Sequence, residues 1–238
     1  MDRYSLINYS LFYEGDYNKI TNAIKNNEEV GKIDKQVKAI TIFDKEYPKV
    51  LFELKYPPLV LYYKGDLSLL NEPAIAIVGS RKACEYALNA TKAICTANSN
   101  NVIISGVALG IDTCAHKHAN KTVGVLGCGI DYIYPSSNYD LFKQIEKDGL
   151  LLSEYPFKVK PLAYHFPFRN RIIAALAQKV YIMQSTLASG TMTTVNEALE
   201  LGREVKVLPY DIFNRFGVNN NNLIYEGATP ITSQEIAF

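Results

Sequence analysis

Residues 74–112, AIAIVGSRKACEYALNATKAICTANSNNVIISGVALGID, decide the fold. The segment holds two short apolar runs, at 74–78 and 101–105, separated by a stretch long enough for a helix. Runs that are apolar at consecutive positions indicate strands buried on both faces, as the strands of a parallel sheet are. The stretch between them is then the crossover helix that two parallel strands require.

The same alternation continues through the rest of the chain. Further apolar runs lie at 123–126, 150–153, 180–183 and 204–208, and helix-length segments lie at 82–98, 110–120, 138–148, 169–178 and 191–202. The pattern predicts an α/β fold, extended and Rossmann-like, with a mainly parallel sheet flanked by helices. Residues 1–45, rich in Asn, Lys, Asp and Tyr, predict a small, mostly helical N-terminal region, and residues 46–238 predict the Rossmann-like domain.

The composition is that of a folded, soluble protein. Of the 238 residues 48% are apolar, and the net charge of +1 means that a polyanionic partner needs a local basic patch. The four cysteines form no C-x-x-C pair, and the first 25 residues contain no apolar signal core. No run approaches the roughly 18 apolar residues of a membrane span. We therefore expect a cytoplasmic protein with no membrane contact, no metal and no cofactor.

Small residues follow four of the predicted strands. They are Gly79-Ser80-Arg81 and the segments 106–112, 127–131 and 184–191. In a parallel sheet such strand ends open on one crevice, where backbone N–H groups and helix N-termini bind anions. No G-x-G-x-x-G follows the first core strand and no Walker A sequence occurs, which argues against a dinucleotide or a P-loop nucleotide. The crevice is predicted to bind phosphate.

Several motifs between about residues 47 and 231 resemble, in order and spacing, the DprA/Smf family of bacterial DNA-processing proteins. They are VGSR at 78–81, SGVALGID at 105–112 with His116, LGCGID at 126–131 with YP at 134–135, SEY at 153–155, FPFRNRII at 166–173, SGT at 189–191 with Thr194, and GAT at 227–229. The resemblance implies an extended Rossmann domain that binds single-stranded DNA, acts in natural transformation, forms a homodimer and helps to load the recombinase RecA. It implies no enzymatic turnover.

Two positions depart from the family pattern. Gln184-Ser185 stands where the family usually has Glu-Ala, and Tyr210 stands where a Gly usually follows the proline. DNA binding is therefore the more secure implication of the resemblance, and recombinase loading the less secure one.

Arg81, Arg169, Asn170 and Arg171 are the predicted phosphate contacts. Arg81 follows a core strand, and the other three begin a predicted helix beside the crevice. Segment 154–171 has four basic residues against one acidic residue, a net charge of +3, and its aromatic rings offer stacking surfaces for bases. Phe166 is assigned to the site, although core packing explains Phe166 and Phe168 at least as well. The predicted DNA- or phosphate-binding set is Gly79, Ser80, Arg81, Gly106, Gly110, Gly127, Gly129, Phe166, Arg169, Asn170, Arg171, Ser189, Gly190 and Thr191.

The glycines of this set and the pair Asp112 and His116 have second interpretations. The glycines either let a phosphate backbone approach or satisfy tight turns. Asp112 and His116 lie four apart on a predicted helix, but no third metal ligand is evident and the helix dipole favours an acidic residue in the first turn. No catalytic residue and no metal ligand is assigned. The run Asn219–Asn222 is predicted to be a solvated loop.

An enzyme is the alternative function. Ser189-Gly190-Thr191 resembles the phosphate loop of lysine-decarboxylase-like nucleoside-monophosphate phosphoribohydrolases, which carry paired glutamates soon after it. Thr193 and Thr194 stand in that place here, and the nearest acid is Glu197. A hydroxyl group cannot replace the general acid or base at neutral pH, so turnover is not expected. A regulatory protein that binds a small nucleotide is the third class that the sequence allows.

Overall fold

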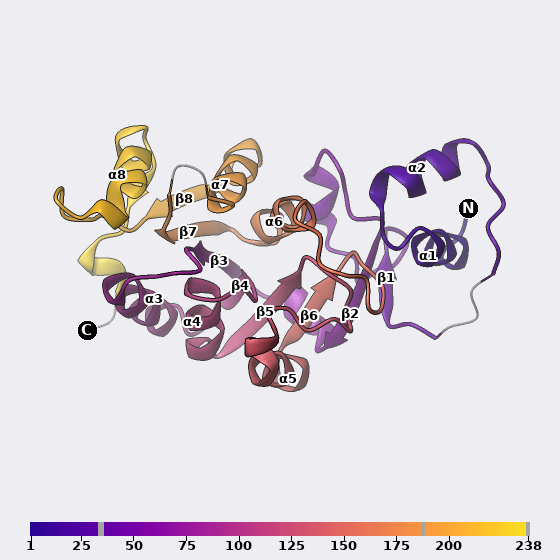
Figure 1. Cartoon of the computed structure of the whole chain (residues 1–238), viewed down its shortest axis with the longest axis horizontal. Helices are drawn as coiled ribbons and strands as arrows, with labels where there is room; N and C mark the ends of the chain where they lie inside the picture. The colour runs from indigo at the N-terminus through magenta and orange to yellow at the C-terminus, as the bar shows by residue number, and fades with distance from the viewer. Residues whose placement is uncertain (33–35, 187–188, 237–238) are drawn as a thin grey trace.

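The computed structural model describes residues 1–32, 36–186 and 189–236, and its centre is a nine-stranded sheet in the order β1-β2-β6-β5-β4-β3-β7-β8-β9 (Figure 1). Every neighbouring pair from β6 to β9 is parallel, which confirms the predicted mainly parallel α/β sheet. The strands are β1 (Ala39–Thr41), β2 (Val60–Gly65), β3 (Ala74–Gly79), β4 (Val102–Gly106), β5 (Lys121–Leu126), β6 (Leu150–Ser153), β7 (Lys179–Gln184), β8 (Glu204–Val207) and β9 (Thr229–Pro230).

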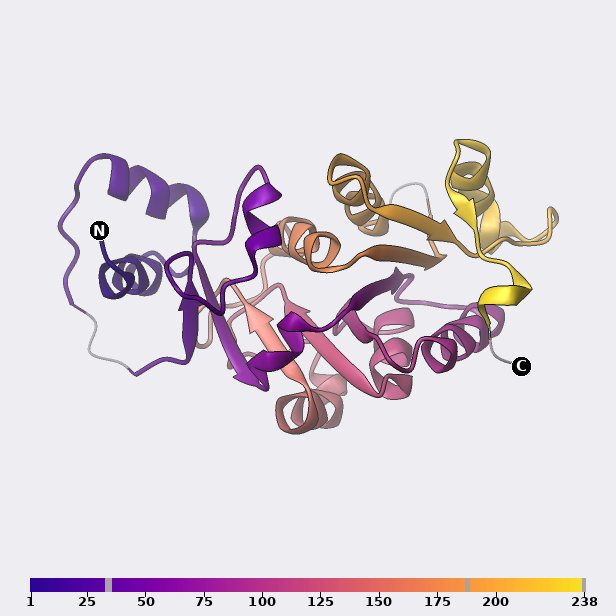
Figure 2. The same cartoon turned by 180° about the vertical axis from the view of Figure 1, so that it is seen from behind.

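Helices cover both faces of the parallel part of the sheet (Figures 1 and 2). One layer contains α6 (His165–Leu176), α7 (Thr191–Glu200) and α8 (Val218–Tyr225), and the other contains α3 (Glu85–Ala97), α4 (Ile111–His118) and α5 (Tyr139–Asp148). Successive residues of β3 face opposite layers, so Ala76 packs in the core beneath α6 and Ile77 packs against α3 and α4. Burial on both faces explains why the central strands contain runs of consecutive apolar residues. No helix within the described ranges is long and apolar enough to cross a membrane.

The N-terminal region begins with two short helices whose starts are set by aspartates. In α1 (Arg3–Phe12) the side chain of Asp2 accepts a hydrogen bond from the Ser5 backbone N–H at 2.8 Å. In α2 (Tyr17–Lys25) Asp16 accepts from the Lys19 N–H at 3.1 Å. Each carboxylate satisfies a backbone donor that the first helical turn leaves free.

The N-terminal region is more closely joined to the sheet than a boundary at residue 46 predicts. Strand β1 lies before that boundary and pairs antiparallel with β2, which pairs antiparallel with β6. Leu6 and Leu11 of α1 pack in one core with Tyr62 and Leu151 of the sheet. The described part of the first 45 residues contains two helices, of 10 and 9 residues, and adds a strand to the edge of the sheet.

Two other elements differ from the prediction. Helix α6 begins at His165 and not at Arg169, so the predicted contact residues lie in its second turn. The run Asn219–Asn222 belongs to α8, and the prediction of a solvated loop is wrong. Asn220 is fully buried, where its side-chain oxygen accepts from the Ser185 N–H at 2.9 Å and its amide donates to the Leu208 carbonyl at 3.0 Å. The asparagine thus satisfies backbone groups that follow β7 and β8.

Candidate functional site

A cavity of about 90 Å³ lies at the carboxyl ends of β3, β4 and β5. Parallel strands place their following loops at one edge of the sheet, so segments distant in sequence meet there. We call it the β4–β5 cavity. Its lining is Arg81, Gly106, Val107, Ala108, Leu109, Val125, Leu126, Gly127, Cys128, Tyr134, Pro135, Phe166 and Arg169.

The mouth of the β4–β5 cavity combines a cation with aromatic rings. Arg81, Leu109 and Tyr134 are exposed, whereas Val107, Cys128 and Arg169 are buried and form the interior. The Arg81 guanidinium lies over the Phe166 ring at 5.4 Å from its centroid, and the Tyr134 and Phe166 rings are 5.5 Å apart. A guanidinium over an aromatic ring is held by electrostatic attraction to the π face. The mouth therefore offers a phosphate contact beside two stacking surfaces.

Arg169 brings a positive charge into the interior. Its side chain is 7% exposed, and its guanidinium donates to the Val125 carbonyl and, through Nε, to Asn170 Oδ1 at 3.0 Å. Gly106 makes room for it, because a Cβ there would lie 2.4 Å from Nη2 of Arg169. No carboxylate among the described residues forms an ion pair with Arg169. The charge of Asp112 favours that of Arg169 but does not contact it directly. A buried guanidinium with only neutral acceptors in contact is costly, which distinguishes this site from an ordinary packed core.

Burial also shifts the pKa values of two titratable groups near Arg169, Asp112 and His116. Desolvation raises the pKa of the Asp112 carboxyl, an effect that the charge of Arg169 and a hydrogen bond from the Ala108 N–H at 3.3 Å oppose. Desolvation, with a smaller effect of Arg169, lowers the pKa of His116 to about 3. His116 is therefore neutral at physiological pH, with Nδ1 2.6 Å from the Thr122 hydroxyl. Asp112 and His116 serve as packing and hydrogen-bonding residues, and no group of metal-binding side chains was found among the described residues.

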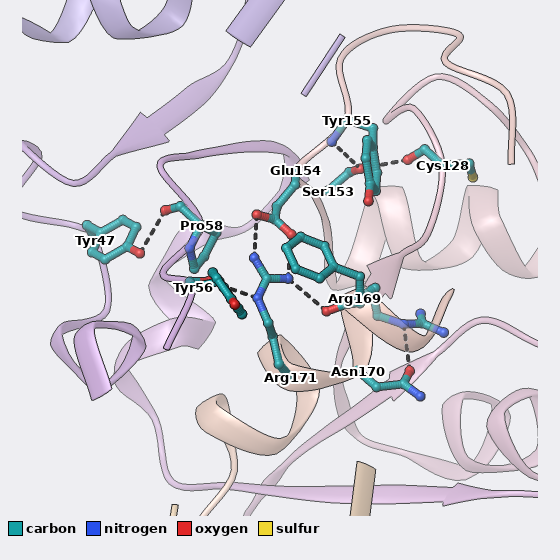
Figure 3. A network of polar contacts seen from close by, with 11 residues as sticks. Tyr47, Tyr56, Pro58, Cys128, Ser153, Glu154, Tyr155, Arg169, Asn170 and Arg171 are labelled. Carbon is teal, nitrogen blue, oxygen red and sulfur yellow. Dashed lines mark hydrogen bonds and ion pairs between the residues drawn. The ribbon is translucent and has the colours of Figure 1, made fainter. Parts of the chain in front are cut away.

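Arg171 has the environment that Arg169 lacks. Its guanidinium donates to both oxygens of Glu154, at 2.6 and 2.7 Å, to the Tyr56 carbonyl at 2.8 Å and to the Phe168 carbonyl at 2.8 Å. Figure 3 shows Arg171 directed at Glu154 and Arg169 directed away from it, toward Asn170. The Phe168 ring lies 3.7 Å from the Arg171 guanidinium carbon. Arg171 is only 2% exposed and its charge is neutralised by Glu154. Its guanidinium is therefore internal and not accessible to a nucleic-acid strand.

Asn170 connects Arg169 with the loop that follows β7. Its side-chain oxygen accepts from Arg169, and its amide donates to the Gly190 carbonyl at 3.0 Å. Ser189, Gly190 and Thr191 do not line the β4–β5 cavity, and residues 187–188 of the predicted phosphate loop lie outside the described residues. Three of the four predicted strand ends therefore meet at the cavity, and the fourth reaches it through Asn170.

The family model for DNA recombination-mediator protein A matches residues 38–237. The chain is 40% identical over 200 residues to DNA processing protein DprA of Streptococcus pneumoniae, covering 82% of this chain and 71% of the relative, and 39% identical over 211 residues to that of Bacillus subtilis, covering 85% and 70%. This chain belongs to the DprA/Smf family.

Solved structures of family members have the same fold. The X-ray structure of DprA from Streptococcus pneumoniae superposes with a TM-score of 0.84 at 32% identity, covering 99% of this chain and 97% of the other. A structure of DNA processing protein A from Helicobacter pylori, described for its single-stranded DNA binding mode, gives 0.75 at 34% identity and covers 83% and 93%.

The two departures from the DprA/Smf pattern are accommodated inside the fold. The Gln184 side chain accepts from the Cys84 N–H at 2.8 Å, just before α3 begins. Tyr210 donates through its hydroxyl to the Met183 carbonyl at 2.9 Å. Its side chain lies against Gly217, where an added Cβ would be 2.0 Å from the Tyr210 Cβ and 2.1 Å from the ring atom Cγ. Both side chains thus tie the end of β7 to its neighbours.

The predicted glycines mostly pack against protein atoms. A Cβ at Gly127 would lie 2.8 Å from the Phe166 ring, so this glycine admits the aromatic wall of the cavity. Gly110 has φ +74° before α4 and approaches the Ser80 carbonyl closely, a backbone conformation that favours glycine. Open space surrounds the Cβ position of Gly190, whereas protein atoms lie within 4 Å of it at Gly79, Gly106, Gly110, Gly127 and Gly129.

The positive charge of segment 154–171 divides between surface and interior. Lys158 and Lys160 are exposed, but Arg169 and Arg171 are buried. Tyr155 is also buried, where its ring stacks on His165 at 3.9 Å between centroids. The net charge of +3 therefore does not form one surface patch. A count of charged residues in the sequence does not distinguish an internal ion pair from an exposed charge.

Sequence reasoning did not assign Tyr134 or Val107 to the site. Tyr134 lies in the YP motif, and its position after a glycine-rich strand end was a usable signal. Val107 has φ +51°, an uncommon conformation for a β-branched residue, and follows β4 directly. Only the fold shows that both face the same cavity as Arg81.

Proposed function

We propose that this DprA/Smf family member binds single-stranded DNA along the carboxyl edge of β3, β4 and β5. The observation that carries the proposal is the exposed Arg81 guanidinium stacked over Phe166 beside Tyr134. A cation next to aromatic rings binds a strand without reading its sequence, because every base has a stacking face and every nucleotide has a phosphate. The structure of the Helicobacter pylori relative is described for its single-stranded DNA binding mode, which supports single-stranded DNA as the ligand proposed here.

The wider role that we propose is DNA processing in natural transformation. The protein would bind incoming single strands in the cytoplasm, protect them and help to load RecA. Support for this role comes from family membership and from the DNA-processing and recombination-mediator descriptions of the relatives. RecA loading is tested by RecA filament formation on strands coated with a single-strand-binding protein, with and without this chain.

The DNA-binding proposal is tested by anisotropy titrations with single-stranded and duplex oligonucleotides. We expect tighter binding of the single strand and a log–log salt slope of about −0.7 for each neutralised phosphate. Arg81→Ala should weaken binding of all sequences about equally and remove about 0.7 from the slope, because phosphate contacts carry no base information. Equal affinity for duplex would contradict the proposal.

Lys55 offers a matched control for Arg81. The Lys55 ammonium also lies 5.4 Å from an aromatic centroid, that of Tyr56. Lys55 and Tyr56 are both exposed, but neither of these two residues lines the β4–β5 cavity. Lys55→Ala should therefore leave the affinity and the salt slope nearly unchanged. Equal losses in Lys55→Ala and Arg81→Ala would mean that the cavity is not the centre of binding.

We infer that the protein acts as a homodimer. Ile212, Phe213 and Tyr225 are 82%, 90% and 93% exposed at the C-terminal end of the molecule. Large apolar side chains this exposed are typical of protein interfaces, and a second copy of the chain is the partner that the family resemblance favours. Light scattering should give a dimer for the native chain and a monomer for Ile212→Ser with Phe213→Ser. A native monomer would contradict the inference.

We also infer that the protein binds without turnover. Thr193 and Thr194 lie in the first turn of α7, and the carboxylate that follows, Glu197, is half-buried with a pKa raised by desolvation and by Glu200. Chromatography should detect no free base released from nucleoside monophosphates. Release that disappears in Glu197→Gln would instead support the phosphoribohydrolase alternative.

A further inference from the structure

The interior of the β4–β5 cavity holds a positive charge that forms no direct ion pair within the described residues. Arg169 is 7% exposed, and the protein acceptors of its guanidinium are two neutral groups, the Val125 carbonyl and the Asn170 side chain. Its Nη2 atom has no acceptor among the described residues, and it lies over Gly106 in the cavity lining. A donor of this kind is expected to have an anionic partner in the functional state.

Two guanidinium groups meet at the β4–β5 cavity. Arg169, on α6, lies in its interior, and Arg81, which follows β3, lies exposed at its mouth. Asp112, in the first turn of α4, is the carboxylate whose charge acts on both arginines, and it accepts from the Ala108 N–H at 3.3 Å. Two cations against one carboxylate leave a net positive charge around this small volume.

The size of the cavity limits what can enter. Its volume of about 90 Å³ is well below the roughly 300 Å³ at which pockets for drug-sized ligands begin. A small tetrahedral anion fits this volume. The sugar and base of such a ligand would remain at the mouth, beside Phe166 and Tyr134.

We propose that the interior of the β4–β5 cavity binds a phosphomonoester, the terminal phosphate of a DNA strand, through Arg169. The inference rests on the proposed single-stranded DNA binding and adds recognition of a strand end to it. A phosphate inside a strand is esterified to two sugars, both of which would have to leave through the same mouth. A terminal phosphate has one ester link and carries a charge of about −1.5 to −2 at pH 7.

The test compares strand ends that differ only in the phosphate. The probes are oligothymidylates of about 12 nucleotides, a length within the site sizes of proteins that bind single strands. One pair carries either a 5′-phosphate or a 5′-hydroxyl, with a fluorophore at the 3′ end. A second pair carries the difference at the 3′ end. We expect one phosphorylated end to bind at least about tenfold tighter, because hydrogen bonds to a desolvated charge are strong. Thymidine monophosphate, thymidine and inorganic phosphate, as competitors, separate a strand end from a free nucleotide or ion.

Two variants separate this site from general strand binding. In Arg169→Met the ratio of affinities for phosphorylated and hydroxyl ends should fall to about one. In Arg81→Ala both affinities should fall while the ratio is kept. Should Arg169→Met fail to fold, the native protein decides: thymidine monophosphate must raise its melting temperature and thymidine must not.

The outcomes distinguish the two proposals. Equal binding of both ends by the native protein, or a ratio that persists in folded Arg169→Met, overturns the strand-end site and leaves single-stranded DNA binding intact. If the native protein binds no single strand but is stabilised by thymidine monophosphate, the proposed function is overturned and the cavity is assigned to free nucleotides.

Discussion

Arg169 and Arg171 lie two positions apart on α6, are both buried, and have opposite electrostatic environments. Arg171 forms a bidentate pair with Glu154, whereas Arg169 contacts only neutral acceptors. A bidentate carboxylate uses the guanidinium donors that a phosphate would otherwise take. The comparison shows that the counter-ion, and not the residue type or its place in a motif, decides which arginine is available to a ligand.

The geometry of the helix explains the difference. Residues two apart on an α-helix point about 200° from each other around its axis, so Arg169 and Arg171 face different parts of the structure. Arg171 meets Glu154, which directly follows β6, and Arg169 lies over the ends of β4 and β5. One arginine ties the helix to the strand, and the other extends into the cavity.

The largest expected effect separates the two arginines by stability. Arg171→Met should lower the free energy of unfolding by about 3–5 kcal/mol, because it leaves the Glu154 carboxylate buried and unpaired. Arg169→Met should lower it by less than about 2 kcal/mol, because the loss of two hydrogen bonds is offset by removal of a desolvated charge that has no direct ion pair. Urea unfolding of both variants measures the difference.

The control for this prediction replaces the whole pair. Glu154→Leu combined with Arg171→Met should recover much of the stability that Arg171→Met loses, since no charge then remains buried. If Arg169→Met proves as damaging as Arg171→Met, the contrast between the two environments is wrong.

A second prediction concerns the pH dependence of stability near Arg169. Burial, together with the charge of Arg169, keeps His116 neutral with a pKa of about 3, against an ordinary 6.5. Below pH 6.5 the unfolded chain binds a proton that the folded chain does not, so stability falls as the pH is lowered from 6.5 toward 3. One proton gives about 2 kcal/mol between pH 7 and pH 5.

The comparison of variants isolates this contribution from that of other titrating groups. His116→Gln should show a shallower decline in unfolding free energy between pH 7 and pH 5 than the native protein. His118, exposed on the same helix, supplies the control, and His118→Gln should follow the native curve. Identical curves for all three proteins would show that His116 titrates normally.

The smallest expected effect tests how Arg169 is positioned. Asn170→Ala removes the acceptor of the Arg169 Nε and the link to the Gly190 carbonyl. One lost hydrogen bond corresponds to about 1 kcal/mol, so the preference for a phosphorylated strand end should fall by a factor of about five. Asn170→Asp restores an acceptor for Arg169 but supplies a competing carboxylate, and should reduce the preference further. A preference unchanged in both variants would remove Asn170 from the site.

Much of the fold could be predicted because burial leaves a direct mark on the sequence. The predicted runs at 74–78 and 101–105 hold consecutive apolar residues because both faces of β3 and β4 are covered. The Asn-rich run of α8 was missed because asparagine is typical of exposed turns, and its burial depends on carbonyls of strands distant in sequence. Strand β1 was missed because three residues are too few for a periodic pattern.

The sequence by itself determined the α/β class, the family and the edge of the sheet that carries the glycine-rich loops. These follow from local apolar periodicity and from motifs, both of which are written along the chain. The tertiary structure alone decided that Tyr134 joins Arg81 at the cavity mouth, and that Glu154 forms an ion pair with Arg171 while Arg169 contacts only neutral acceptors. Charge pairing depends on distances of a few ångströms between segments far apart in sequence, and only the packed fold sets those distances.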